Sequence, residues 1–428
     1  MPRMGELVRR LSVSGAGLLL VSAAAAQSPP APAALGAETP SEPLSTFWDA
    51  VGSGRTWLNL RYRYEHADID GFPKKSDAST LRTALGYETG RYKGFRGFVE
   101  FESVDAIGSE RFNSTVNGQT DRPPIPDPIG TEVNQAYLGY DGFESVDGRL
   151  GRQTVVYGTS RFIGDVAWRQ NYQTFEAVRL TSDELGAVDF DYTFAHRVNR
   201  IFGERSPQGT EEVNSHFLNA HFDWARVGKD TLHGYAYDHR DSVALRTTTF
   251  GARLDGIQDL GALDLGNVAE FAQQNDAFSN PIKIDQQYYF AEASARFDLF
   301  SFFLGWEQLG GSGEVGNKFS TPFATLHKFN GFADLFLVTP DEGLIDRYAT
   351  LAIFFPVDAL PRRPSLTATY HVFDSDAGNI RYGQEFDFVF AVPVTERATV
   401  AFKWADFRAD QRFEDTLRYA AYVTLRVL

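Results

Sequence analysis

Long segments of strictly alternating apolar and polar residues constrain this chain more than any other feature. The last segment, TLRYAAYVTLRVL (416–428), places Leu417 and Tyr419 on one face and Arg418 and Arg426 on the other. Side chains of a β-strand point alternately to its two faces, so this pattern predicts a strand with one apolar face. The same alternation recurs in LNLRYRYEH (58–66), GFRGFVEFE (94–102), VDFDYTFAHR (188–197) and QEFDFVFAV (384–392).

The length of these segments favours strands that cross a membrane. They span about 9–12 residues, as a tilted strand needs to cross a bilayer, whereas soluble strands average about 5–6. Aromatic residues, 14% of the chain, concentrate near the ends of the apolar faces, as in the girdles of membrane barrels. In lipid only a helix or a closed barrel satisfies its own backbone, and the mature sequence shows no membrane-helix pattern. The apolar faces are therefore expected to point to lipid and the polar faces into a wet lumen.

Counting the alternating segments predicts an all-β, antiparallel transmembrane barrel of about eighteen strands, with short periplasmic turns and long extracellular loops. HKFNGFADLFLV (327–338) would make the count odd, so we expect it to belong to a long loop, 309–343, that folds into the lumen. The strands are expected near 56–66, 80–90, 94–103, 132–141, 148–157, 173–181, 187–197, 214–224, 230–238, 246–254, 263–273, 287–297, 301–308, 345–355, 364–373, 382–391, 397–407 and 416–427.

The N-terminus has the pattern of a cleaved export signal. Arginines precede the apolar run SGAGLLLVSAAAA, which ends in a small-residue cleavage pattern before Gln27. The run is too short and too rich in alanine for the alternative, a membrane anchor. The sequence predicts a signal peptide at 1–26, a Pro/Ala-rich linker at 27–46 and the barrel at 47–428. The chain is therefore expected in the outer membrane of a Gram-negative cell.

Several kinds of chemistry are disfavoured. The chain has no Cys, which excludes disulfides and thiolate metal sites, and its net charge of -15 argues against nucleic acid as a partner. Asp374, Asp376 and Glu385 occupy positions 1, 3 and 12 of a calcium-loop pattern, but Asn379 stands where that loop requires Gly, so a surface turn is favoured. Motifs of common hydrolases and nucleotide-binding enzymes are missing. No catalytic residue, metal or cofactor is predicted.

Two long segments resemble signature regions of the alginate export family of outer-membrane proteins. They are FSTPFATLHKFNGFADLFLVTPDEGLIDRY (319–348) and GRLGRQTVVYGTSRFIGDVAWRQNYQTFEAVRL (148–180), and GQEFDF (383–388) is a third match. The resemblance implies an eighteen-stranded barrel that secretes an anionic polyuronate through an arginine-lined constriction, with loops as gates. The chain departs from the usual barrel pattern at its end, Leu428, where an aromatic residue is typical.

Alternation places a set of cations on the lumen side. A guanidinium binds a carboxylate bidentately and stays charged, so arginines on neighbouring strands would form a track of weak contacts for a polyanion. The alternative is that they only pair with inward acids such as Glu100 or Asp387. Those of the first and last strands are expected to form a basic stripe that faces an acidic wall on 187–197 and 382–391. The predicted lumen cations are Arg61, Arg63, Arg82, Arg96, Arg179, Arg253, Arg296, Lys403, Arg418 and Arg426.

The expected function is a channel for an anionic, alginate-like polysaccharide. Outer-membrane lipid and a periplasmic export partner are its other expected partners. The alternatives are a diffusion porin for small acidic solutes, an outer-membrane enzyme, and a soluble secreted lectin or lyase. Residues expected in loops either form a gate or outer binding site, or simply pack on the barrel mouth. They are Arg161, Trp168, His327, Lys328 and Asp334.

Overall fold

Within the described residues, eighteen antiparallel strands form one sheet, which closes where β1 (Arg55–Ile69) pairs with β18 (Thr416–Arg426). The structure, a computed structural model, describes residues 46–143, 145–185, 188–224 and 228–427. The predicted signal peptide and all but the last residue of the predicted linker lie outside these ranges. The remaining strands are β2 (Ser76–Glu88), β3 (Phe95–Ala106), β4 (Gly130–Phe143), β5 (Val146–Gln153), β6 (Thr174–Leu185), β7 (Val188–Asn199), β8 (Thr210–Trp224), β9 (Gly228–Tyr237), β10 (Thr247–Asp259), β11 (Asp264–Asp276), β12 (Asp285–Arg296), β13 (Phe300–Leu309), β14 (Leu344–Phe354), β15 (Ser365–Asp374), β16 (Arg381–Thr395), β17 (Ala398–Ala409).

The closed barrel confirms the predicted fold class and strand count. Each strand expected from alternation is present, with ends that differ by a few residues. Helical structure in the described residues is limited to α1 (Phe47–Gly52) and two single turns, η2 (Val243–Leu245) and η3 (Leu326–Lys328). No helix in these ranges is both long and apolar enough to cross a membrane.

The apolar face of the wall points outward. Tyr62 and Leu85 are 38% and 47% exposed on the outside of β1 and β2, whereas Arg61 and Arg63 are 6% and 1% exposed. Since neighbouring residues of a strand point to opposite faces, the arginines point into the barrel. The predicted orientation of the two faces is therefore confirmed.

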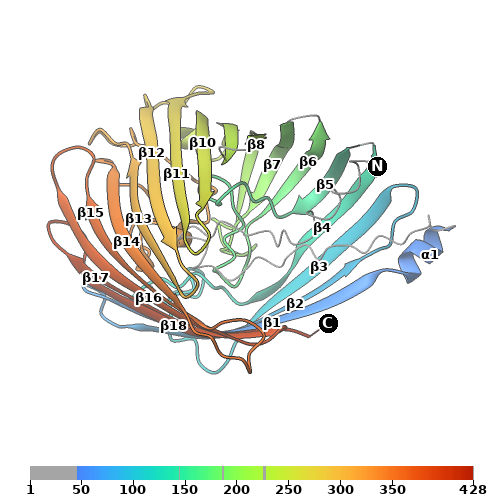
Figure 1. Cartoon of the computed structure of the whole chain (residues 1–428), viewed down its shortest axis with the longest axis horizontal. Coiled ribbons are helices and arrows are strands. Elements are labelled where there is room, and N and C mark those ends of the chain that lie inside the picture. Colours follow the sequence, from blue (N-terminus) through green and yellow to red (C-terminus); the bar gives the residue numbers. More distant parts are fainter. Residues whose placement is uncertain (1–45, 144, 186–187, 225–227, 428) are drawn as a thin grey trace, which may run out of the picture.

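Short and long connections lie at opposite ends of the barrel. α1 and the end of β18 lie at the end with mostly short turns, and the longer loops lie at the other end (Figure 1). In outer-membrane barrels short turns face the periplasm and long loops face outward. We use "periplasmic" and "outer" for the two ends in this sense.

Three outer loops fold back into the barrel. The expected strand 148–157 ends at Gln153 because the chain then turns inward, where Val155 and Tyr157 are 0% and 4% exposed. These residues join a core in which rings of the loops, such as Phe323, pack against rings of the wall, such as Phe217. The loop 309–343 therefore folds into the lumen, as predicted. We call residues 123–128, 160–173 and 319–336 the plug.

Candidate functional site: a plugged lumen lined with cations

Backbone hydrogen bonds join two of the plug segments into one unit. Ile163 and Phe323 form a parallel bridge, and the Gly164 amide donates to the Phe323 carbonyl at 2.8 Å. The Thr325 amide donates to the Ser160 carbonyl at 3.0 Å. A Cβ on Gly164 would lie 2.2 Å from the Thr325 hydroxyl oxygen, so this close approach requires glycine.

The first plug segment is attached through Asp127. One carboxylate oxygen of Asp127 accepts a hydrogen bond from the Gln170 amide at 2.8 Å. The other oxygen forms an ion pair with Arg63, and the two side chains are 0% and 1% exposed. Asp127 therefore connects the plug to β1 as well as to its neighbouring segment.

Five cations of four adjacent strands form what we call the basic wall. Arg61 lies directly opposite Arg82 in the β1–β2 register, and Arg418 pairs with Ala67 nearer the outer end of β1. Each of the five is no more than 7% exposed. The members are Arg61 and Arg63 (β1), Arg82 (β2), Lys403 (β17) and Arg418 (β18).

Arg61 binds the plug through neutral oxygens. Its guanidinium donates to the Gln170 side-chain oxygen at 2.9 Å, to the Ala167 carbonyl at 2.7 Å and to the Arg169 carbonyl. It makes no salt bridge with a described residue. Arg82 instead pairs with Glu102 of β3, and its guanidinium lies 4.1 Å from the Tyr172 ring centre.

Arg169 brings a cation of the plug into the same region. It pairs with Glu65 of β1 at 3.2 Å and with Asp334 of the third plug segment at 2.7 Å. Glu65 also lies 3.3 Å from Arg63 and 3.6 Å from Arg418. Glu65 therefore lies among three cations, Arg63, Arg169 and Arg418, and neutralises only part of their charge.

Trp168 stands at the centre of the contact between plug and wall. Its ring stacks on His327 with a centroid distance of 4.5 Å, and the cations of Arg63 and Lys403 lie 4.6 Å and 4.2 Å from its ring centre. The Lys403 ammonium donates to His327 Nε2 at 2.8 Å, while Nδ1 of the same ring lies 2.6 Å from Asp334.

The charge states around His327 follow from burial. Burial lowers the pKa of His327 to about 3 although Asp334 acts in the opposite direction. The imidazole is therefore neutral, and its Nε2 accepts from Lys403. Burial would raise the pKa of Asp334, but the hydrogen bond from His327 and the charges of Arg169 and Arg418 outweigh it and hold that pKa well below its usual value.

Acids of β16 bind the other side of the plug backbone. The amides of Phe332 and Ala333 donate to Asp387 at 3.2 Å and Glu385 at 2.7 Å, and Arg418 donates to the Ala333 carbonyl at 3.0 Å. β16 pairs with β17, so these acids lie beside the basic wall, and the prediction that strand 382–391 faces it is wrong. The plug backbone thus offers carbonyls to cations and amides to acids.

The remaining loop candidates also lie inside the barrel. Arg161, 3% exposed, pairs with Glu307 of β13 at 2.6 Å and donates to Asn330 at 3.2 Å. The Lys328 ammonium donates to the Thr159 carbonyl at 2.9 Å. Burial lowers the pKa of Lys328 to about 8, against the attraction of Asp165. All five predicted loop residues therefore belong to the plug, and none simply packs on the mouth.

The other predicted lumen cations are scattered along the wall. Arg96 pairs with Asp147 at 2.5 Å, Arg179 pairs with Asp191, and Arg253 pairs with Glu270 at 2.9 Å. Two more lie near the periplasmic ends of their strands, outside the basic wall, and are partly exposed: Arg296 and Arg426.

The arginines of the basic wall point inward as predicted, but in this conformation they do not face a wet lumen. The basic wall is covered by the plug, and most of the cations have acidic partners, as the pairing alternative predicted. Arg426 lies opposite Asn59, apart from the stripe formed by its expected neighbours. Alternation within strands correctly predicted that each arginine points inward. It carries no information about which loop residues pack over the inward face.

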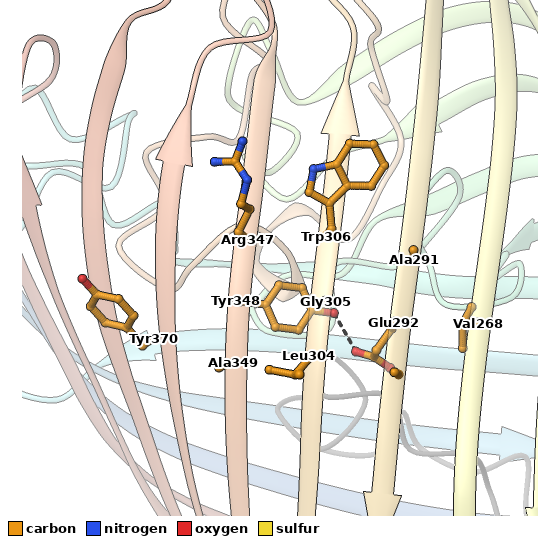
Figure 2. Close-up of a pocket in the computed structure, with 11 residues that line it drawn as sticks. Val268, Ala291, Glu292, Leu304, Gly305, Trp306, Arg347, Tyr348, Ala349 and Tyr370 are labelled. Carbon is orange, nitrogen blue, oxygen red and sulfur yellow. Dashed lines mark hydrogen bonds between the residues drawn. The ribbon is translucent and has the colours of Figure 1, made fainter.

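On β12, β13 and β14, a side chain of one strand covers a glycine of the next and contacts the strand beyond it. The Tyr348 ring of β14 crosses Gly305 of β13, and its hydroxyl donates to Glu292 of β12 at 2.6 Å (Figure 2). A Cβ on Gly305 would lie 2.0 Å from that ring, so glycine is required there. On the outward face of the wall, Trp306 and Arg347 border a depression of about 540 Å³ that reaches Gly305 and Tyr348.

The three residues of the calcium-loop pattern do not converge. Asp374 pairs with Arg347 at 2.6 Å, Asp376 accepts from Gln308 at 2.7 Å, and Glu385 binds the plug. Among the described residues no group of three or more potential metal ligands is present. The favoured reading, a turn, agrees with Asn379, which adopts a positive φ of 53°.

Comparison with known families identifies the barrel. The family model for alginate export matches residues 56–272, just over half of the chain. The chain belongs to the alginate export family. The match includes plug residues 160–173 and ends before the third plug segment. The family is one of transport, and together with the closed barrel it makes this chain an outer-membrane channel.

Solved structures with the same fold are distant in sequence. OccK5 (OpdH) of Pseudomonas aeruginosa is 14% identical, with a TM-score of 0.65 over 89% of this chain and 99% of that chain. OccK9 (OpdG) of the same organism is 13% identical, with a TM-score of 0.67 over 88% and 100%. OccAB2 of Acinetobacter baumannii is 14% identical, with a TM-score of 0.66 over 89% and 100%. No curated protein matches the sequence significantly.

Proposed function

We propose that this channel passes an anionic polysaccharide, an alginate-like polyuronate, along the basic wall, and that the plug closes the lumen in the conformation described. The observation that carries the proposal is the way the basic wall binds the plug. Arg63 binds a carboxylate of the plug, Asp127, while Arg61 and Arg418 bind neutral carbonyl oxygens. A polyuronate also offers carboxylates and neutral oxygens at short intervals, so the plug occupies the cations with groups of the same kind.

Displacement of the plug would change the charge of the lumen. Asp127, Asp334 and Arg169 leave with the plug, whereas the five cations of the basic wall stay on their strands. Among the buried charged side chains of β1, β2 and β18, four of these cations then remain with one acid, Glu65, so this part of the wall carries a surplus of positive charge. The other acids nearby lie on the flanking strands, Glu100 and Glu102 on β3 and Glu385 and Asp387 on β16. Arginine stays charged at any working pH, and charges in a narrow lumen are screened less than charges on exposed loops.

Weak binding is needed for transport. A polyanion must be attracted strongly enough to enter and weakly enough to leave, and several equivalent cations allow one contact to form as another breaks. Glu65, within 3.6 Å of Arg418 and 3.3 Å of Arg63, reduces the strength of each contact. The second candidate, a porin for small acidic solutes, uses the same cations and differs in the size of the substrate.

The test is the current through single barrels in a planar bilayer with oligouronates of increasing length. The proposal predicts that the block deepens with oligomer length and that neutral oligosaccharides of matched size block less. Arg61→Gln with Arg418→Gln is expected to weaken the block. The control is Arg347→Gln, which removes a 51% exposed cation from the outward face. A block by monomers as strong as that by oligomers would favour the small-solute porin.

A further inference from the structure

α1 lies against the outward face of the barrel at its periplasmic end. The Tyr87 hydroxyl donates to the Val51 carbonyl, and the Gly90 amide donates to the Ala50 carbonyl at 2.8 Å. Tyr87 is two positions from Leu85 on β2, so its side chain points to the same outward face, where Leu85 is 47% exposed. The helix therefore rests on the side of β2 that faces the membrane and does not cross the mouth, and Figure 1 shows it beyond the ends of β1 and β2.

The orientation of this short helix is fixed at both ends. The Thr46 hydroxyl accepts from the Asp49 amide and the Asp49 carboxylate accepts from the Thr46 amide, both at 3.1 Å, in a capping box. Ala50 is 2% exposed against the wall. After the helix, a Cβ on Gly54 would lie 2.1 Å from the Tyr87 hydroxyl, so the chain passes the wall closely there.

The face of α1 that points away from the barrel is aromatic. Trp48 is 76% exposed and Phe47 is 54% exposed, and the Phe47 ring lies 6.5 Å from that of Tyr92 in the turn between β2 and β3. Contacts of 4.5 Å and 5.0 Å join three further rings along the rim of β3 and β4. The rim cluster consists of Phe47, Trp48, Tyr92, Phe95, Tyr140 and Phe143.

The rim cluster continues the lipid-facing surface of the barrel. Phe95, 46% exposed, points to the same outward face of β3 as Phe101, and Tyr140 points to the same outward face of β4 as Leu138. Phe143, 65% exposed, follows a register shift after Tyr140 and lies with its ring 5.0 Å from the Tyr140 ring. One exposed cation accompanies the rings: the Lys93 ammonium lies 5.3 Å from the Tyr92 ring centre and makes no salt bridge with a described residue.

We propose that α1 is an interfacial membrane anchor, with Phe47 and Trp48 inserted at the boundary of headgroups and acyl chains in the periplasmic leaflet and Lys93 beside lipid phosphates. Trp and Tyr are enriched at such boundaries, and a basic residue beside them is attracted to anionic headgroups. A contiguous exposed apolar patch marks a contact with protein or membrane. Continuity with the lipid-facing wall favours phospholipid over a periplasmic protein.

The absence of Cys from the sequence allows a direct test. Phe47→Cys in the full-length protein takes a single spin label, and its collisions with oxygen and with a water-soluble nickel chelate are compared in phospholipid vesicles. Leu85→Cys on the outward wall is the lipid control, and Ser312→Cys in an exposed outer loop is the water control. The proposal predicts an oxygen-to-nickel ratio close to that of Leu85→Cys. A ratio equal to that of Ser312→Cys, in vesicles without any partner protein, would overturn it.

A second measurement leaves Phe47 in place. The fluorescence of Trp48 is obtained as the difference between the wild type and Trp48→Phe, in vesicles with and without shallowly brominated lipids. Quenching of this difference is expected. The matched control is Trp57→Phe, because Trp57 points into the lumen and donates to Glu100 at 3.0 Å. If bromination quenched the Trp48 difference no more than the Trp57 difference, α1 would lie away from the bilayer.

Discussion

Arg169 and Asp334 form an ion pair of 2.7 Å inside the barrel, with side chains 4% and 3% exposed. The two residues are 165 positions apart and belong to different outer loops. Arg169 is also bound to Glu65 of the wall, and Asp334 is bound to His327, which accepts from Lys403. The pair therefore joins two loops into one plug and connects that plug to the basic wall.

Asp334→Asn is expected to loosen the plug without disturbing the barrel. The change removes the acidic partner of a buried cation, and breaking a buried pair in this way costs about 3–5 kcal/mol. We expect a higher mean conductance in planar bilayers. Heat-modifiable migration on gels checks that the barrel is still closed. An assembled Asp334→Asn barrel that conducts like the wild type would show that the pair does not hold the lumen shut.

Acidification is expected to open the plug through His327. The pKa of His327 is about 3 while the plug is docked. When the plug is released, the His327 side chain is in water, where the pKa of a histidine is about 6.5, so between these pH values release is accompanied by the binding of a proton. The free energy of plug docking is therefore independent of pH above about 6.5 and becomes less favourable as the pH falls toward 3. Asp334 acts in the same direction at the lowest pH, because its docked pKa is depressed. Conductance against pH should rise on acidification in the wild type and rise less in His327→Gln.

Alkaline conditions are expected to act on Lys328 in the opposite sense. Its docked pKa is about 8, below the usual 10.4 of an exposed lysine, so the released plug binds more protons between these values. Docking therefore becomes more favourable as the pH rises from 8 toward 10.4. Conductance should fall over this interval in the wild type, and Lys328→Met should remove the change. A fall of equal size in Lys328→Met would assign the effect to other groups.

The polarity of the wall is tested by two neighbouring positions of β1. Leu60→Arg places a charge on the outward face and should cost about 2–4 kcal/mol if the site lies near the bilayer midplane. Asn59→Arg places the same charge on the inward face and should be tolerated. Urea unfolding from lipid vesicles measures both. Equal losses would mean that the face or the register of β1 is wrong.

Sequence reasoning recovered the barrel because the property it used is local. Alternation within a strand decides which residues face lipid, so the inward orientation of Arg61, Arg63 and Arg418 could be read directly. A closed barrel brings its first and last strands together, so the pairing of β1 with β18 could also be predicted from the order of the strands. The parity of strand numbers also assigned the segment around His327 to a loop, and its apolar residues required a place inside the barrel.

Sequence reasoning missed what lies over the basic wall. Glu65 belongs to the alternating segment 58–66 and shares the face of Arg61 and Arg63, but Asp127 and Arg169 lie in loops, where no periodicity indicates direction. Their contacts with Arg63 and Asp334 join positions far apart in the chain. The resemblance to the alginate export family marked both long plug segments, and it was the only signal that singled out Arg161 and Trp168 before the geometry was known.

The central claim, that the basic wall carries an anionic polysaccharide, is tested most directly by the reversal potential of single barrels under a salt gradient. The account predicts anion selectivity for the wild type and for Asp334→Asn, reduced current when oligouronates enter, and loss of both in Arg61→Gln combined with Arg63→Gln and Arg418→Gln. A cation-selective wild-type pore that is indifferent to oligouronates would contradict it.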